Sequence, residues 1–129
     1  MGLFSVSLPV IAILNDDLFV GEAVGNLDRT GTIELRSVRD DRDKCAGRFR
    51  FTGLRVGVAE LRCDDGAEAT LTFNALGLFS GYGVGTTRRG PASFTFGLSP
   101  EEAAAHLTLP PGRKLVRAAE GLKLESVRP

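Results

Sequence analysis

The two cysteines, Cys45 and Cys63, could take part in more than one kind of chemistry. Each falls on the inward-facing row of an alternating segment, and both are equally far from Leu54, so an antiparallel hairpin sets them directly opposite each other. Opposed residues of this kind lie about 4.5 to 5.5 Å apart at Cα, within the range that a disulfide spans. Three interpretations stay open: a structural disulfide, two reduced buried thiols, and a redox switch, for which no helix N-terminus or neighbouring base is evident.

Acidic side chains gather at one end of the predicted sheet. Five aspartates lie in a loop and in the turn beside it, namely Asp40, Asp41, Asp43, Asp64 and Asp65. Carboxylates clustered in this way are the ligands that Ca²⁺ prefers. The Asp-x-Asp-x-Asp-Gly ligand ladder is not present, however, and Arg39, Arg42 and Lys44 are interleaved with the aspartates. We therefore favour solvated turns with surface ion pairs over a calcium site, and we expect no metal and no cofactor.

Alternating glycines at Gly81, Gly83 and Gly85 invite comparison with nucleotide-binding loops. A dinucleotide fingerprint requires a helix opening directly after the glycines, whereas these alternate within a predicted strand that leads to a turn. Glycines on an inward face instead predict that something bulky approaches them, either aromatic rings, the short helix or a ligand. If the interior is partly open, they would line a ligand cavity together with Phe49, Phe73, Phe94 and Phe96. We expect a filled interior, because protein interiors are close-packed.

His106 is the only histidine. A nucleophilic triad needs Ser or Cys beside the imidazole and a carboxylate to orient it, and the Gly-x-Ser-x-Gly elbow does not occur in the sequence. Near a helix C-terminus His106 would interact with the last carbonyls. We identify no catalytic residue and do not expect an enzyme.

The elements that position these residues begin with the cysteine hairpin, predicted over residues 44 to 52 and 56 to 63. In the cysteine register the inner face pairs Gly47 with Leu61, Phe49 with Ala59 and Phe51 with Gly57. The outer face sets Lys44 against Asp64 and Arg48 against Glu60. A slip of one residue would turn the apolar row to solvent, so the register is strongly specified. Asp64-Asp65-Gly66 then turns the chain into residues 67 to 74, where Arg62 meets Glu68.

Two further hairpins and a helix follow the same sequence rules. Residues 18 to 27 and 32 to 38 flank Asp28-Arg29-Thr30-Gly31, where Gly31 suits a left-handed position. Residues 79 to 87 and 91 to 97 flank Arg88-Arg89-Gly90. Ser99, Pro100 and Glu102 form a capping box with proline at the first helical position, which predicts a helix of about two turns through His106.

These elements predict an all-β fold, an antiparallel β-barrel or sandwich of six to eight strands built from hairpins, with one short helix near residues 100–107. The glycine rows favour a barrel because they permit strong coiling and closure. We expect a single β domain over residues 1–112, with an apolar N-terminal segment at 1–16, and a strand or mobile terminus over 113–129. Edge strands, 18 to 27 or the tail, would offer pairing to a protein partner or a second copy.

Composition narrows the classes of partner. The 129 residues include 16 basic and 16 acidic side chains, so the long-range field that nucleic-acid binders use is missing. The only long apolar stretch, Leu3 to Leu14, contains Pro9 and is too short to span a bilayer. It is interpreted as an initial strand, or alternatively as a degenerate signal peptide.

A composite pattern joins Gly25 to Gly31 and Thr32-Ile33-Glu34-Leu35 to Cys45-x-Gly47-x-Phe49 and Cys63-x-Asp65-Gly66. Over about residues 18 to 97 it resembles small bacterial β-domain proteins of unknown function, some of them exported or lipid-anchored. The resemblance implies a periplasmic or exported domain with a disulfide, and it brings no catalytic residues. The chain departs from that group in lacking a clear signal peptide or lipobox.

For function, we expect a non-enzymatic binding or structural module of the bacterial envelope or of a larger assembly. One alternative is a carrier of small apolar ligands with a barrel cavity, which a cavity lined by the phenylalanines would favour. The other is an unrecognised enzyme that uses His106 or the aspartates.

Overall fold

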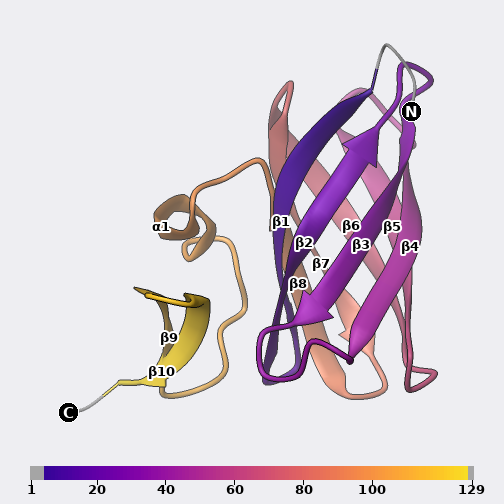
Figure 1. Ribbon diagram of the computed structural model, residues 1–129. Coiled ribbons are helices and arrows are strands. Elements are labelled where there is room, and N and C mark those ends of the chain that lie inside the picture. The colour runs from indigo at the N-terminus through magenta and orange to yellow at the C-terminus, as the bar shows by residue number, and fades with distance from the viewer. Residues whose placement is uncertain (1–4, 128–129) are drawn as a thin grey trace.

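The computed structural model describes residues 5–127 as ten β-strands and one short α-helix (Figure 1). The elements are β1 (Val6–Leu14), β2 (Asp17–Gly25), β3 (Thr30–Ser37), β4 (Lys44–Phe51), β5 (Val56–Cys63), β6 (Glu68–Gly77), β7 (Ser80–Thr87), β8 (Gly90–Phe96), α1 (Pro100–Ala103), β9 (Arg113–Ala118) and β10 (Gly121–Ser126). Residues 1–4, which include the start of the apolar segment expected at Leu3, and residues 128–129 lie outside the described range. The predicted all-β class is confirmed.

Strands β1 to β8 form a closed barrel in which each strand pairs with its neighbours in sequence and β8 pairs back with β1. All of these pairings are antiparallel, so the chain runs up and down around the barrel (Figure 1). Closure distinguishes the barrel from the sandwich alternative. It also places β2 between β1 and β3, so the expectation that residues 18 to 27 form a free edge for a partner was wrong.

The cysteine hairpin has the predicted register. Cys45 stands opposite Cys63 on β4 and β5, and Arg48 stands opposite Glu60. The outer-face ion pairs follow the register only in part. Arg62 and Glu68 lie 2.6 Å apart as expected, whereas the carboxylate of Glu60 lies 3.5 Å from the diagonal Arg50 guanidinium. Long side chains on one face reach diagonal neighbours, so register alone does not determine the ion pair.

Barrel closure depends on glycines at points where neighbouring backbones come close. A Cβ atom added at Gly21 would lie 1.8 Å from the carbonyl oxygen of Glu34, and one added at Gly47 would lie 1.8 Å from that of Glu60. No side chain fits at such a distance, so only glycine permits these sharply coiled corners.

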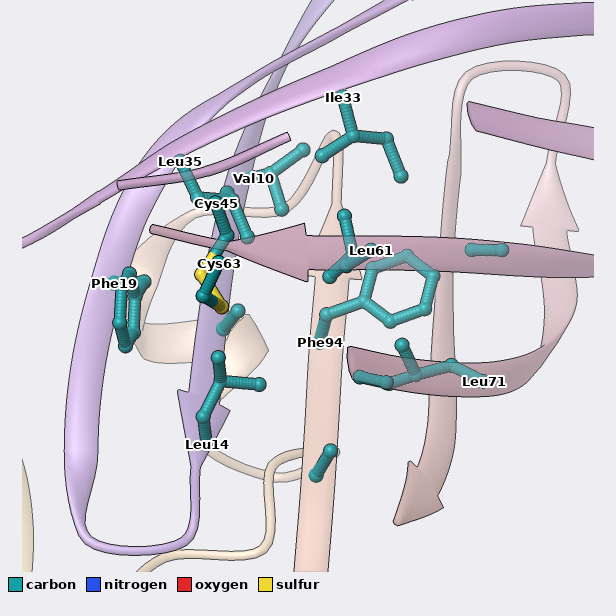
Figure 2. Packing of buried hydrophobic residues seen from close by; sticks show 14 of the residues in the cluster. Val10, Leu14, Phe19, Ile33, Leu35, Cys45, Leu61, Cys63, Leu71 and Phe94 are labelled. Carbon is teal, nitrogen blue, oxygen red and sulfur yellow. A yellow bond between two sulfur atoms is a disulfide. The ribbon is translucent and has the colours of Figure 1, made fainter. Parts of the chain in front are cut away.

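Inward-facing residues of β1 to β8 and the turns between them pack into one buried core inside the barrel (Figure 2). Its members are Val10, Ala12, Leu14, Phe19, Ala23, Ile33, Leu35, Cys45, Ala59, Leu61, Cys63, Ala67, Ala69, Leu71, Phe73, Ala92 and Phe94. Three half-buried rings, Phe49, Phe51 and Phe96, pack against this set. An eight-stranded barrel encloses just enough room for side chains to fill it or for one small ligand.

The C-terminal part packs against the outside of the barrel, and α1 and the β9–β10 hairpin lie to one side of it in Figure 1. Ile11, Ile13 and Leu18 on the outer face of β1 and β2 are buried together with Ala103 and Leu107. Strands β9 and β10 pair with each other, so the tail forms strands, one of the two alternatives expected for it. Among the described residues, no helix has the length and apolar character needed to cross a membrane.

Helix α1 has the predicted capping box but is shorter than expected. The Ser99 side chain accepts a hydrogen bond from the backbone N–H of Glu102, and the Glu102 side chain accepts one from the Ser99 N–H. The helix ends at Ala103, so the expected second turn was wrong. His106 N–H bonds to the Ala103 carbonyl three residues back, which tightens the chain and brings Leu107 into the outer core.

Candidate ligand site at the open end of the barrel

The two ends of the barrel differ in chemistry. Because the strands alternate in direction, the β2–β3, β4–β5 and β6–β7 turns share one end, here called the open end. The turns at the other, closed end carry the aspartates singled out in the sequence. The open end instead presents four large apolar side chains, with exposed fractions of 74% for Leu27, 85% for Leu54, 91% for Leu78 and 54% for Phe79. Exposed apolar groups gathered in one place indicate a binding surface.

A cavity of about 230 Å³ extends into the barrel from the open end. It is lined by Val6, Leu8, Ala23, Gly25, Asn26, Leu27, Arg29, Ile33, Phe49, Phe51, Phe73, Leu78, Phe79, Phe94 and Phe96. The four phenylalanines named from the sequence are all in this set. The expectation of a completely filled interior was therefore wrong at this end, because the rings stand around the space and do not occupy it.

Phe73 on β6 is the centre of the aromatic wall. Its ring makes edge-to-face contacts with four other rings, at centroid separations of 6.1 Å to Phe49, 5.1 Å to Phe51, 6.2 Å to Phe94 and 5.8 Å to Phe96. Edge-to-face pairs are favourable beyond the area that they bury. The network therefore holds five rings from three strands in fixed orientations around the cavity.

The predicted glycine row does not line the cavity. A Cβ atom added at Gly81 would lie 2.4 Å from the Phe96 ring, and one added at Gly83 would lie 2.4 Å from the Phe94 ring, so these rings cover the two glycines. A Cβ atom added at Gly85 would lie 2.0 Å from the backbone carbonyl oxygen of Thr70, which marks a close approach of two strands. The assignment of these glycines to a ligand site was wrong, but the expectation that bulky rings approach them is correct for Gly81 and Gly83.

Gly25, at the end of β2, lines the cavity and has space beside it for a side chain. A Cβ atom added there would meet only the Phe49 ring, at 3.5 Å, which is an ordinary van der Waals contact. Larger side chains at this position would grow into the cavity without striking backbone. Gly25 is therefore the natural place to block the site by substitution.

Arg29 lies at the cavity entrance and was not identified from the sequence. Its backbone is in the left-handed conformation, with φ of 66°. The sequence predicts this conformation for Gly31, but Gly31 lies within β3. The Arg29 guanidinium stands 4.1 Å from the centroid of the Phe51 ring, a cation–π contact. Its Nη2 donates hydrogen bonds to the carbonyls of Gly53, at 3.0 Å, and Leu54, at 2.8 Å. Arg29 thus links the β2–β3 and β4–β5 turns across the rim.

The closed end is filled and cross-linked. Cys45 and Cys63 are buried, and their sulfur atoms lie at bonding distance, 1.97 Å, as a disulfide within the core (Figure 2). Of the three interpretations, the structure has the disulfide. Buried side chains of Leu14, Phe19 and Leu35 share this cluster. The cavity is therefore open at one end only.

Three of the five aspartates at the closed end form ion pairs with arginines. Arg89 forms ion pairs with both Asp43 and Asp65, and Arg42 lies 3.2 Å from Asp40. Hydrogen bonds from Arg42 and from the Ala67 N–H lower the pKa of Asp40 and of Asp65 respectively. Over residues 5–127, no three acidic, histidine or cysteine side chains are grouped so as to hold a metal ion.

Asp17 is a buried carboxylate that sequence patterns did not reveal. Ser37 donates its hydroxyl proton to the Asp17 carboxylate at 3.1 Å, and the Arg39 guanidinium lies 3.4 Å away. Burial raises the pKa of Asp17 above its ordinary value, because desolvation outweighs these favourable contacts.

Replacing Asp17 with Asn is expected to alter how stability depends on pH. A raised pKa means that the folded state binds the proton more tightly, so the free energy of unfolding falls as pH rises from the unfolded value through the folded one. Asp17→Asn removes this loss, so its stability relative to the wild type should increase with pH. Urea unfolding from about pH 3 to about pH 8 measures the difference. Asp16→Asn removes the same charge from an exposed neighbour as a control, and a constant difference for Asp17→Asn would contradict the desolvated carboxylate.

His106 follows α1 and contacts the barrel through an aromatic stack. Its ring stacks on Tyr82 of β7, with centroids 4.6 Å apart and an interplanar angle of 20°. The side chain makes this stack, while the backbone N–H of His106 bonds to the carbonyl of Ala103, the last helical residue, at 2.9 Å. The aspartates lie at the closed end, whereas Tyr82 is near the start of β7 at the open end, so the fold does not bring the two together.

The open-end cavity, with its aromatic wall and its arginine, is the feature of this chain best suited to a function. No protein-family model, curated protein or solved structure matches the chain.

Proposed function

We propose that the protein is a carrier of small apolar ligands, which it binds in the open-end cavity. The observation that carries the proposal is a space of about 230 Å³ walled by phenylalanine rings and open to solvent at one end of a closed barrel. An apolar cavity of about 150 Å³ is large enough to bind benzene. This cavity therefore suits a single ring or a short alkyl chain, which favours the carrier of small apolar ligands, one of the alternatives to the expected binding or structural module.

The rest of the barrel supports this proposal by holding the cavity in shape. The disulfide and the packed closed end anchor the strands, and the edge-to-face ring network restrains the wall. A preformed site loses little conformational entropy when a ligand enters. Displacement of water from the apolar wall then supplies the free energy of binding.

Hexan-1-ol provides a simple test, because its chain fits the cavity and it carries no charge. Burial of its methylene groups at about 0.8 kcal/mol each predicts a dissociation constant on the order of a millimolar. Chemical-shift titration of the isotopically labelled protein measures this affinity.

The blocking variant is Gly25→Leu, whose side chain would fill part of the cavity. Excluding two methylene groups of the ligand weakens binding by about 1.6 kcal/mol, or at least about tenfold. Ala46→Leu adds a similar apolar group on the exposed outer face of β4 and should bind hexan-1-ol as the wild type does. Equal affinity in both variants, or no saturable binding by the wild type, would contradict the proposed function.

A further inference from the structure

The entrance of the open-end cavity contains a cation that lacks a carboxylate partner. Within residues 5–127, no Asp or Glu oxygen lies within ion-pair distance of Arg29. The neighbouring carboxylate of Asp28 is directed away, since it accepts hydrogen bonds from the hydroxyl and the N–H of Thr30 at 2.6 and 3.1 Å. These bonds lower the pKa of Asp28, so it stays ionised on its own turn.

The position of the Arg29 guanidinium is determined by its surroundings. The left-handed backbone, the Phe51 ring below it and the two carbonyls of the β4–β5 turn hold the group at the rim. A single nitrogen, Nη2, makes both carbonyl bonds, while Nε and Nη1 donate to no atom of the described residues. The N–H of Nε and the two N–H groups of Nη1 therefore remain free beside an apolar cavity, and each can donate a hydrogen bond to a carboxylate oxygen.

Charge elsewhere on the barrel favours an anion at this end. Most of the aspartates in turns, including Asp40, Asp43 and Asp65, are at the closed end, where arginines pair with them, whereas the open-end turns carry Asp28, Arg29 and a second arginine, Arg55, just before β5. An anionic ligand would thus meet Arg29 at the rim and stay far from most carboxylates. A cationic or neutral ligand gains nothing from this arrangement.

We propose that the ligand is a short apolar carboxylate, with its tail among the phenylalanine rings and its carboxylate on the free N–H groups of Arg29. This inference rests on the proposed function and adds the chemical class of the ligand. The cavity accepts the tail of an aliphatic or monocyclic aromatic acid, and the rim position of Arg29 leaves the carboxylate partly in water. An ion pair that is exposed to water in this way contributes only modestly to the free energy of binding.

Three ligands with six carbon atoms each and different head groups test the charge preference. Hexanoate, hexan-1-ol and hexylammonium are titrated into the full-length protein at low ionic strength, near neutral pH. Hexanoate should bind about fivefold more tightly than hexan-1-ol, and hexylammonium more weakly than either. Added salt should reduce the preference for hexanoate, because exposed charges are screened.

Substitutions test whether Arg29 causes the preference for hexanoate over hexan-1-ol. Arg29→Asn removes the charge with a residue that tolerates the left-handed conformation, and it should reduce the hexanoate to hexan-1-ol affinity ratio to about one. Arg29→Lys keeps the charge without the planar guanidinium and should retain part of the ratio. Arg55→Asn removes an equal charge from the same end, outside the cavity lining, and should leave the ratio close to that of the wild type.

The outcomes separate this inference from the proposed function. Equal binding of hexanoate and hexan-1-ol, with both blocked by Gly25→Leu, would overturn the carboxylate assignment and leave the carrier function standing. A ratio that falls as much in Arg55→Asn as in Arg29→Asn would also overturn it, since the charge would then act at long range. If none of the three ligands binds, the carrier function itself fails.

Discussion

Phe73→Ala is expected to lower the free energy of unfolding by about 3 to 5 kcal/mol, the range for truncating a buried phenylalanine. The Phe73 side chain is 2% exposed and contacts four other rings edge-to-face. Truncation removes buried apolar surface and leaves the surrounding rings without their common partner. Urea denaturation of wild type and variant measures the change.

The same substitution should also enlarge the open-end cavity, because Phe73 forms part of its wall. Phe79→Ala is the matched control: it removes an identical side chain from the rim, where 54% of the residue is already exposed, and should cost far less. A loss below about 1 kcal/mol for Phe73→Ala, or equal losses for the two variants, would show that the ring network does not stabilise the barrel.

Removing the disulfide with Cys45→Ala/Cys63→Ala should cost about 3 kcal/mol. The bond closes a loop with a sequence separation of 18 residues, and loops of this size restrict the unfolded chain by about that amount. Both side chains are buried at the closed end, so the substitution also removes sulfur packing there. Thermal or urea unfolding of oxidised wild type and double variant gives the difference.

Reduction of the wild type is the matched control for this measurement, because it breaks the bond and keeps both sulfur atoms. The reduced protein should lie between the oxidised protein and the double variant in stability. If the oxidised and reduced proteins unfold at the same denaturant concentration, the disulfide has no stabilising role. The barrel register would then depend on strand pairing alone.

The cysteine hairpin illustrates what the sequence makes predictable. Alternation of apolar and polar residues has a period of two, so one opposed pair sets the register of β4, β5 and β6 together. The same rules located the capping box at Ser99, because its hydrogen bonds are local. Local patterns of this kind correctly predicted most of the strands and the four hairpin pairings β2–β3, β4–β5, β5–β6 and β7–β8.

The cavity could be predicted only in part. Phe49, Phe73, Phe94 and Phe96 share the inward rows of the sequence pattern, and all four line the cavity. Whether rings fill a barrel or surround a space depends on how eight strands close, and that is a property of the whole sheet. For this reason the sequence did not show that rings cover Gly81 and Gly83, or that Gly85 lies against the backbone of the neighbouring strand.

Arg29 and Asp17 were missed because their surroundings come from distant parts of the chain. Arg29 contacts the turn at Gly53 and Leu54, and Asp17 is buried beside Ser37 on another strand. A left-handed arginine has no sequence signal, since glycine is the usual choice and Gly31 stood two residues away. The packing of the C-terminal part against the outer face of β1 was also missed, because the residues in contact are far apart in the sequence.

A crystal structure of the protein with 6-bromohexan-1-ol tests the central claim most directly, because anomalous scattering locates the bromine without ambiguity. The account predicts a bromine peak inside the barrel, among the rings of Phe49, Phe73 and Phe94, with the hydroxyl toward the rim. A bromine found only on the outer surface, or phenylalanine rings that close over the space and leave no room for the chain, would contradict it.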